Sequence, residues 1–95
     1  AIGAEYETQV RIEGVGRVDF VIEGWLIIEC DSREFHEGWL AQVEDRRRDL
    51  AAAARGYVTI RPLATDVMER PDIVRGAVID VMAALGMRGG RGRRS

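Results

Sequence analysis

Three acidic residues lie within or at the end of two short apolar stretches, where a carboxylate is costly unless it has a partner. Asp19 lies within residues 17–22 (RVDFVI), and Glu29 and Asp31 close residues 25–31 (WLIIECD). The β-branched and aromatic residues of both stretches indicate strands. Because residues two apart on a strand share a face, we expect Glu29 and Asp31 to lie side by side. Converging carboxylates of this kind suit Mg²⁺ or Mn²⁺.

The turn between these strands decides whether the acids converge. A two-residue turn would place Asp19 and Glu29 on opposite faces of the hairpin. A three-residue turn pairs Ile22 with Leu26 and sets Asp19 opposite Glu29, and Gly24 can adopt the left-handed conformation that such turns need. A metal site therefore requires the longer turn or a bulge. The alternative is a strand end with ordinary surface acids.

Two further side chains near these acids could take part in chemistry. His36 follows closely and could act as a base or a ligand, or could be structural. Cys30 points away from the acids on an alternating strand, which favours a small core residue. One cysteine and one histidine exclude an internal disulfide and a Cys/His zinc cluster, and they fit a reducing cytoplasm.

All fourteen basic residues are arginine, so any mechanism that needs a catalytic lysine is excluded. Residues 1–45 hold eleven acids against three arginines, a net charge of −8, and residues 46–95 carry +6. This division suggests a site that uses both signs, such as metal-dependent phosphodiester chemistry. The alternative is two solvated faces of opposite charge. No run approaches the ~18 apolar residues of a membrane helix, so we expect no membrane partner.

Three consecutive arginines, residues 46–48, fall in a predicted helix, where they spread over an arc of ~200°. At least one must therefore face the sheet or its rim, and Arg47 is placed there by its distance of seven residues from Leu40. The functional interpretation is a phosphate clamp beside the acids. The alternative is ion pairing along the helix with Glu44, Asp45 and Asp49.

The length of 95 residues allows one hydrophobic core. The pattern predicts an α/β fold of the mixed-sheet, α+β kind, in which three antiparallel strands precede a crossover helix, a fourth parallel strand and a C-terminal helix. The expected strands are 5–12, 17–22, 25–31 and 57–61, and the expected helices are 39–55 and 71–86, with a helical turn at 65–70. We expect Trp39, Val43, Leu50 and Ala54 to form the inward stripe of the first helix.

The last helix and the residues after it suggest two further features. Ile73–Leu85 is apolar enough to seed a homodimer, which would make the chain a small interaction domain. Residues 87–95 are rich in glycine and arginine and lack an apolar pattern, so we expect a basic disordered tail after a domain of residues 1–86.

Five short motifs follow one another along residues 9–71: GRVDFV at 16–21, IIECD at 27–31, FH at 35–36, DRRRD at 45–49 and GYVTIR at 56–61. Together they resemble bacterial domains related to the very-short-patch repair endonuclease, within the PD-(D/E)xK nuclease superfamily. The resemblance implies a restriction-endonuclease-like core and metal-dependent cleavage of DNA.

The resemblance also implies roles for individual residues. Asp19 and Glu29 match the superfamily's metal-binding acids, and the Cys30 backbone carbonyl would add a ligand. Asp31 takes the place of the usual lysine, and His36 matches a histidine on which the repair-endonuclease branch relies. Arg48 would be the phosphate contact on the helix.

These observations lead us to expect a cytoplasmic, Mg²⁺- or Mn²⁺-dependent deoxyribonuclease that nicks DNA. The alternative is a catalytically inactive nucleic-acid-binding or regulatory module on the same fold. The superfamily usually has a helix before the first strand, and we expect that helix to be missing here. The domain could therefore belong to a larger protein with an upstream DNA-binding domain.

Overall fold

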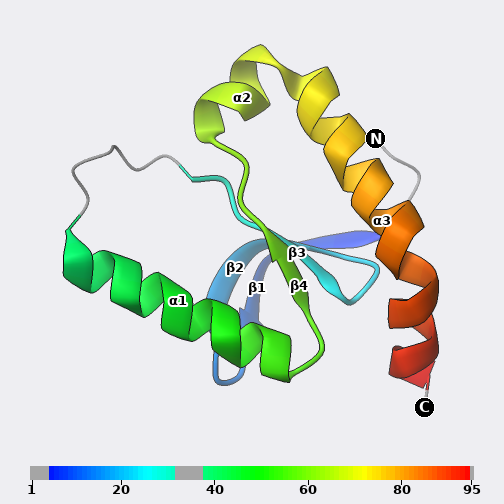
Figure 1. The fold of residues 1–95 in the computed structure, drawn as a ribbon, viewed down its shortest axis with the longest axis horizontal. Coiled ribbons are helices and arrows are strands. Elements are labelled where there is room, and N and C mark those ends of the chain that lie inside the picture. Colours follow the sequence, from blue (N-terminus) through cyan, green and yellow to red (C-terminus); the bar gives the residue numbers. More distant parts are fainter. Residues whose placement is uncertain (1–4, 32–37, 95) are drawn as a thin grey trace.

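The computed structural model describes residues 5–31 and 38–94, with side chains described as far as Gly86. Within these residues the chain forms one four-stranded sheet in the order β1-β2-β3-β4 (Figure 1). The elements are β1 (Tyr6–Ile12), β2 (Gly16–Ile22), β3 (Leu26–Ile28), α1 (Trp39–Ala54), β4 (Val58–Ile60), α2 (Ala64–Glu69) and α3 (Pro71–Arg94). The first three strands are antiparallel and β4 runs parallel to β3. This confirms the predicted mixed sheet, the meander and the parallel fourth strand.

The turn between β2 and β3 has the longer of the two predicted lengths. Ile22 pairs with Leu26 and Phe20 pairs with Ile28, which leaves three residues in the turn. Glu23 and Gly24 both have positive φ, at 56° and 78°, so two successive residues of the turn are in the left-handed conformation. The register expected for converging acids is therefore present up to Phe20 and Ile28.

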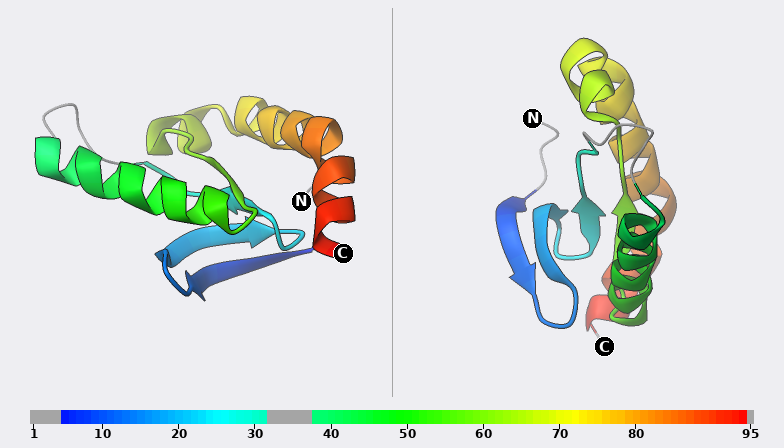
Figure 2. Two further views of the ribbon diagram at one scale, coloured as in Figure 1. Left: turned by 60° about the horizontal axis from the view of Figure 1, so that its bottom comes forward. Right: turned by 90° about the vertical axis from the view of Figure 1, so that its left-hand side faces the viewer.

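The core divides into two apolar clusters on opposite faces of the sheet. Ile27 packs with Ala52 of α1, whereas its neighbours Leu26 and Ile28 pack with Val78 of α3. Because successive residues of a strand point to opposite faces, α1 and α3 cover opposite faces of the sheet. Figure 2 shows both helices with the sheet from two further sides.

The inward face of α1 differs from the predicted one. Trp39 and Leu50 are 65% and 73% exposed, so the predicted apolar stripe is wrong, and Ala52 is the buried residue of this helix. Asp45, Arg48 and Asp49 are only partly exposed, and Arg47 is exposed. The helix is turned this way because Ala52 contacts the sheet and Arg48 donates hydrogen bonds to the β1–β2 hairpin.

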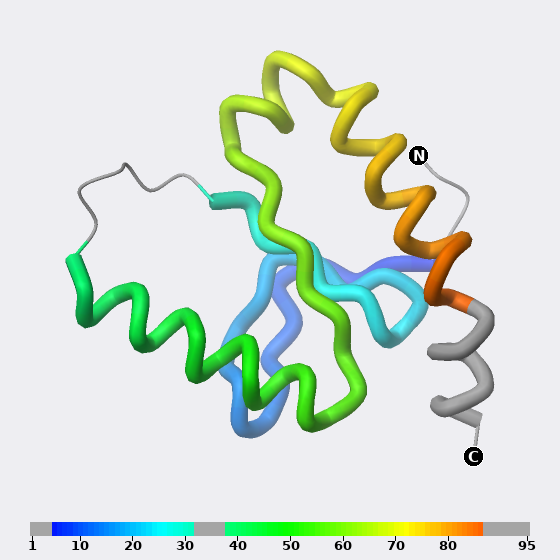
Figure 3. Tube along the Cα trace, in the orientation of Figure 1, coloured from blue at the N-terminus to red at the C-terminus, as the bar shows by residue number. Residues whose placement is uncertain are grey.

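The path from α1 through β4 into α2 and α3 can be followed along the Cα trace (Figure 3). Val74, Val78, Val81, Met82 and Leu85 of α3 pack on the sheet, whereas Ile73 and Ala77, which share the apolar helical spacing, are exposed. The helix does not end at Gly86, where the sequence predicted its end, but continues to Arg94. The division into a domain of residues 1–86 and a basic tail at 87–95 stays a prediction, and the side chains after Gly86 lie outside the described residues. Among the helices described, none is both long and apolar enough to cross a membrane.

Candidate functional site

Glu29 follows β3 directly and faces α1, with its side chain 12% exposed. Its Oε2 accepts a hydrogen bond from Nη2 of Arg48 at 3.0 Å, and its Oε1 accepts one from Nη1 of Arg61 at 2.9 Å. Each carboxylate oxygen therefore has its own guanidinium. These charge-assisted contacts hold Glu29 in one orientation between α1 and β4.

Arg61 reaches Glu29 because of the parallel register between β3 and β4. Ile28 pairs with Ile60, so the next residues on each strand, Glu29 and Arg61, lie side by side. The second Nη of Arg61 donates to Oδ1 of Asp49 at 2.6 Å. Partial burial disfavours the charged form of Arg61, but the hydrogen bond to Asp49 and the charges of Asp49, Glu29 and Asp45 outweigh it and raise its pKa.

Arg48 joins α1 to the β1–β2 hairpin as well as to Glu29. Its Nε donates to the Val15 carbonyl at 3.1 Å, and its Nη2 donates to the Arg17 carbonyl at 2.9 Å. These acceptors occupy much of the guanidinium's donor capacity. The predicted role of Arg48 in phosphate contact stays a prediction, and the structure adds a positioning role for this side chain.

Asp19 reaches the end of β3 from the neighbouring strand. Its Oδ2 accepts a hydrogen bond from the Cys30 backbone N–H at 3.0 Å, beyond the last β2–β3 pair, Phe20 and Ile28. The Asp19 carboxylate therefore lies at the peptide group that joins Glu29 to Cys30. The structure thus places the Asp19 carboxylate at the Cys30 main chain, while the Glu29 carboxylate is directed to Arg48 and Arg61.

Cys30 faces the other way and is half-buried. It lines an apolar groove of about 240 Å³ on the α3 side of the sheet, together with Phe20 and Val74. Burial raises the pKa of the Cys30 thiol, and the negative charge of Asp19 raises it further. The thiol is therefore kept protonated and is a poor nucleophile at neutral pH.

The remaining predicted residues are placed as follows. Asp31 continues the parallel pairing: its N–H donates to Pro62, its carbonyl accepts from Ala64, and it forms an isolated bridge with Leu63. His36 lies outside the described residues. Over the part of the chain that the structure describes, no group of three or more His, Cys, Asp or Glu residues is placed to hold a metal ion.

Sequence reasoning missed two members of the site, Arg61 and the role of Asp49. The available signal was that the strands before and after the crossover are each followed by a charged residue, Glu29 and Arg61. The charges of these two residues have opposite signs. The cavity beneath this network has a volume of only about 10 Å³, which is no more than one water molecule needs. This network therefore encloses no space for a small molecule.

Comparison of the chain with protein-family models, with curated proteins and with solved structures gave no match.

Proposed function

We propose that this chain is a metal-dependent endonuclease domain that cleaves DNA on a restriction-endonuclease-like core. The observation that carries the proposal is the contact between the Asp19 carboxylate and the Cys30 amide, directly beside Glu29. Two acidic side chains and a main-chain carbonyl, one acid from within β2 and the others from the residues that follow β3, are a hard-oxygen donor set. The same residues are the ones that the motif resemblance marks as metal-binding.

Carboxylate and carbonyl oxygens are the kind of ligand that Mg²⁺ binds. Magnesium sites in phosphoryl-transfer proteins use one or two carboxylates, with waters and substrate oxygens completing the shell. Glu29 uses one acceptor site on each oxygen for Arg48 and Arg61, and a carboxylate has about four such sites. Glu29 therefore keeps acceptor sites for an ion, and Asp19, Glu29 and the Cys30 carbonyl are the residues that would hold it.

Such an ion supplies a bound water of lowered pKa and stabilises negative charge on phosphate. The chain's own contribution is orientation. Arg48 and Arg61 hold Glu29 from two sides, and the Cys30 amide holds Asp19. His36 is the candidate for proton transfer on the motif resemblance alone, and Asp31 would assist from the adjoining residue.

Nicking of supercoiled plasmid tests the proposal, with Mg²⁺, Mn²⁺ and EDTA compared. The variants are Asp19→Asn and Glu29→Gln, and the control is Glu44→Gln, which changes an exposed acid of α1. We expect nicking that requires metal, is lost by at least about 100-fold in both site variants, and is retained in the control. Circular dichroism confirms that each variant is folded.

Nicking that survives in folded Asp19→Asn would contradict the proposal, because the cleaving site would then lie elsewhere. The proposal would also be contradicted if the folded wild-type chain binds DNA but does not cleave it with either Mg²⁺ or Mn²⁺.

A specific observation favours a second function, a catalytically inactive nucleic-acid-binding module on the same fold. Glu29 lies against two guanidiniums, whose positive charges oppose a divalent cation at the same carboxylate. In that case the Arg48–Glu29–Arg61 network holds the fold together, and DNA binding would be the same in Mg²⁺ and in EDTA.

A further inference from the structure

Two arginines lie directly opposite each other at the end of the β1–β2 hairpin. Arg11 and Arg17 are cross-strand partners in the antiparallel register, and both are exposed. Cross-strand partners share a face, and their Cβ atoms are typically ~5 Å apart. Two positive charges are therefore held close together at the surface.

The face that carries this pair is the one turned away from α1. Ile12 and Val18, the sequence neighbours of Arg11 and Arg17, belong to the cluster under α1, so the arginines point to the other face. Neither arginine is among the residues packed under α3. This part of the hairpin is thus open to a large partner.

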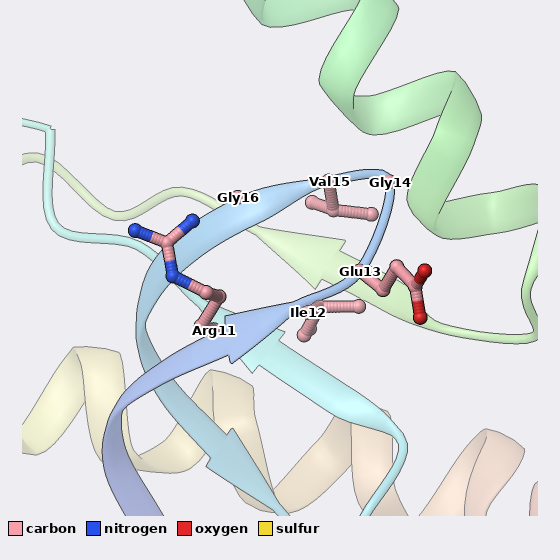
Figure 4. Close-up of a pocket in the computed structure, with 6 residues that line it drawn as sticks. All are labelled: Arg11, Ile12, Glu13, Gly14, Val15 and Gly16. Atoms are coloured by element: carbon pink, nitrogen blue, oxygen red, sulfur yellow. The ribbon is translucent and has the colours of Figure 1, made fainter.

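The nearby acid Glu13 does not pair with either arginine. Arg11 lines an open hollow of about 510 Å³ formed by residues 11–16, and Figure 4 shows its guanidinium and the Glu13 carboxylate directed to different sides. Throughout residues 5–31 and 38–86, neither Arg11 nor Arg17 has an acidic partner within ion-pair distance.

Like charges placed directly opposite on a sheet destabilise it, so this pair weakens the free protein. A bound phosphate removes the repulsion, because a guanidinium fork matches phosphate geometry and always carries its charge. The pair is also connected to the candidate site. The Arg17 carbonyl accepts a hydrogen bond from Arg48, which contacts Glu29, and Arg17 precedes Asp19 by two residues, roughly 7 Å along the strand.

We propose that the outer face of the β1–β2 hairpin, centred on Arg11 and Arg17, binds the phosphate backbone of a nucleic acid. The choice of nucleic acid rests on the proposed function, and the surface itself rests on the charge pair. Contacts of this kind position a nucleic acid without reading its sequence.

Fluorescence anisotropy with a labelled DNA duplex, in EDTA and over a series of NaCl concentrations, tests this inference. The variant is Arg11→Gln/Arg17→Gln, and the matched control is Arg70→Gln/Arg75→Gln, which removes the same charge from the α2–α3 region. We expect the hairpin variant to raise Kd about tenfold or more and to lower the slope of log K against log salt by roughly two. The control should retain the wild-type slope.

A charge reversal, Arg17→Glu, separates binding from folding. It gives Arg11 an opposite partner, so Tm should stay level or rise while DNA binding falls. Equal weakening by the hairpin and control variants would overturn the inference, because net charge alone would then explain binding. An absence of DNA binding by the wild-type chain at 50 mM NaCl would overturn it too. Failure of Asp19→Asn to abolish nicking contradicts the proposed function and leaves this comparison intact.

Discussion

Replacing Arg61 by methionine should destabilise the protein more than removal of any ordinary surface charge. The change removes the donor to both Glu29 and Asp49 but keeps an unbranched apolar stem. Glu29 is 12% exposed and would lose one of its two partners. Breaking a fully buried pair costs 3–5 kcal/mol, and a hydrogen bond to a charged group contributes about 1.5–3 kcal/mol.

Partial exposure lowers this figure. Arg61 is 22% exposed and Asp49 is 43% exposed, so water and salt screen both contacts. We therefore expect a loss of about 2 kcal/mol in the free energy of unfolding. For a domain of this size that corresponds to a fall in Tm of roughly 8–15 °C.

The matched control is Arg75→Met, because the Arg75–Asp72 pair is long, at 4.0 Å, and its side chains are 52% and 94% exposed. It should cost about 0.5 kcal/mol or less. Urea unfolding followed by fluorescence reports the difference, since Trp25 is buried in the core. Adding Glu29→Gln to Arg61→Met should cost less than the sum of the two single changes. Equal stability of the Arg61 and Arg75 variants would refute the reasoning.

Two further predictions concern Cys30 and α1. Because burial and the charge of Asp19 raise the pKa of Cys30, iodoacetamide should alkylate it slowly at pH 8, and Asp19→Asn should speed the reaction. The raised pKa of Cys30 also makes stability depend on pH. The unfolded thiol ionises near pH ~8.5, while the folded thiol keeps its proton. The contribution of the thiol to stability is therefore complete below that pH and falls as the pH rises above it. Cys30→Ser should remove the part of this loss of stability that comes from the thiol, as measured by urea unfolding across pH 7–10. For α1, Leu50→Gln should change the free energy of unfolding by about 0.5 kcal/mol or less, whereas Ala52→Gln should cost about 1–3 kcal/mol. Equal effects would contradict the packing of the helix through Ala52.

The elements that were predictable are those whose signal is local. The turn at Glu23 and Gly24 follows from the glycine and from the patterns of the strands on either side. That turn fixes the register, and the register leads Asp19 toward Glu29. The C-terminal helix was predictable for the same reason, since one wide stripe from Val74 to Leu85 meets a single apolar face.

The rotation of α1 was not predictable from its own hydrophobicity. Small alanines and charged side chains face the sheet, and the large apolar residues Trp39, Leu40 and Leu50 face outward. The predicted stripe rests on the rule that the more hydrophobic face of a helix is turned toward the core. It fails here because Arg48 has acceptors on the hairpin and on Glu29, which are visible only once the strands are paired.

The arginines around Glu29 also explain how a chain without lysine arranges positive charge beside its acids. A lysine could supply one compact charge from the same strand, but a guanidinium fork can bridge two acceptors at fixed geometry. Arg48 comes from α1 and Arg61 follows β4, so the charge arrives from two separate elements. Because both elements meet at Glu29, this carboxylate joins the helix, the fourth strand and the third strand. A change at Glu29 must therefore be judged by folding and by activity together, since a loss of either could follow from the same two contacts.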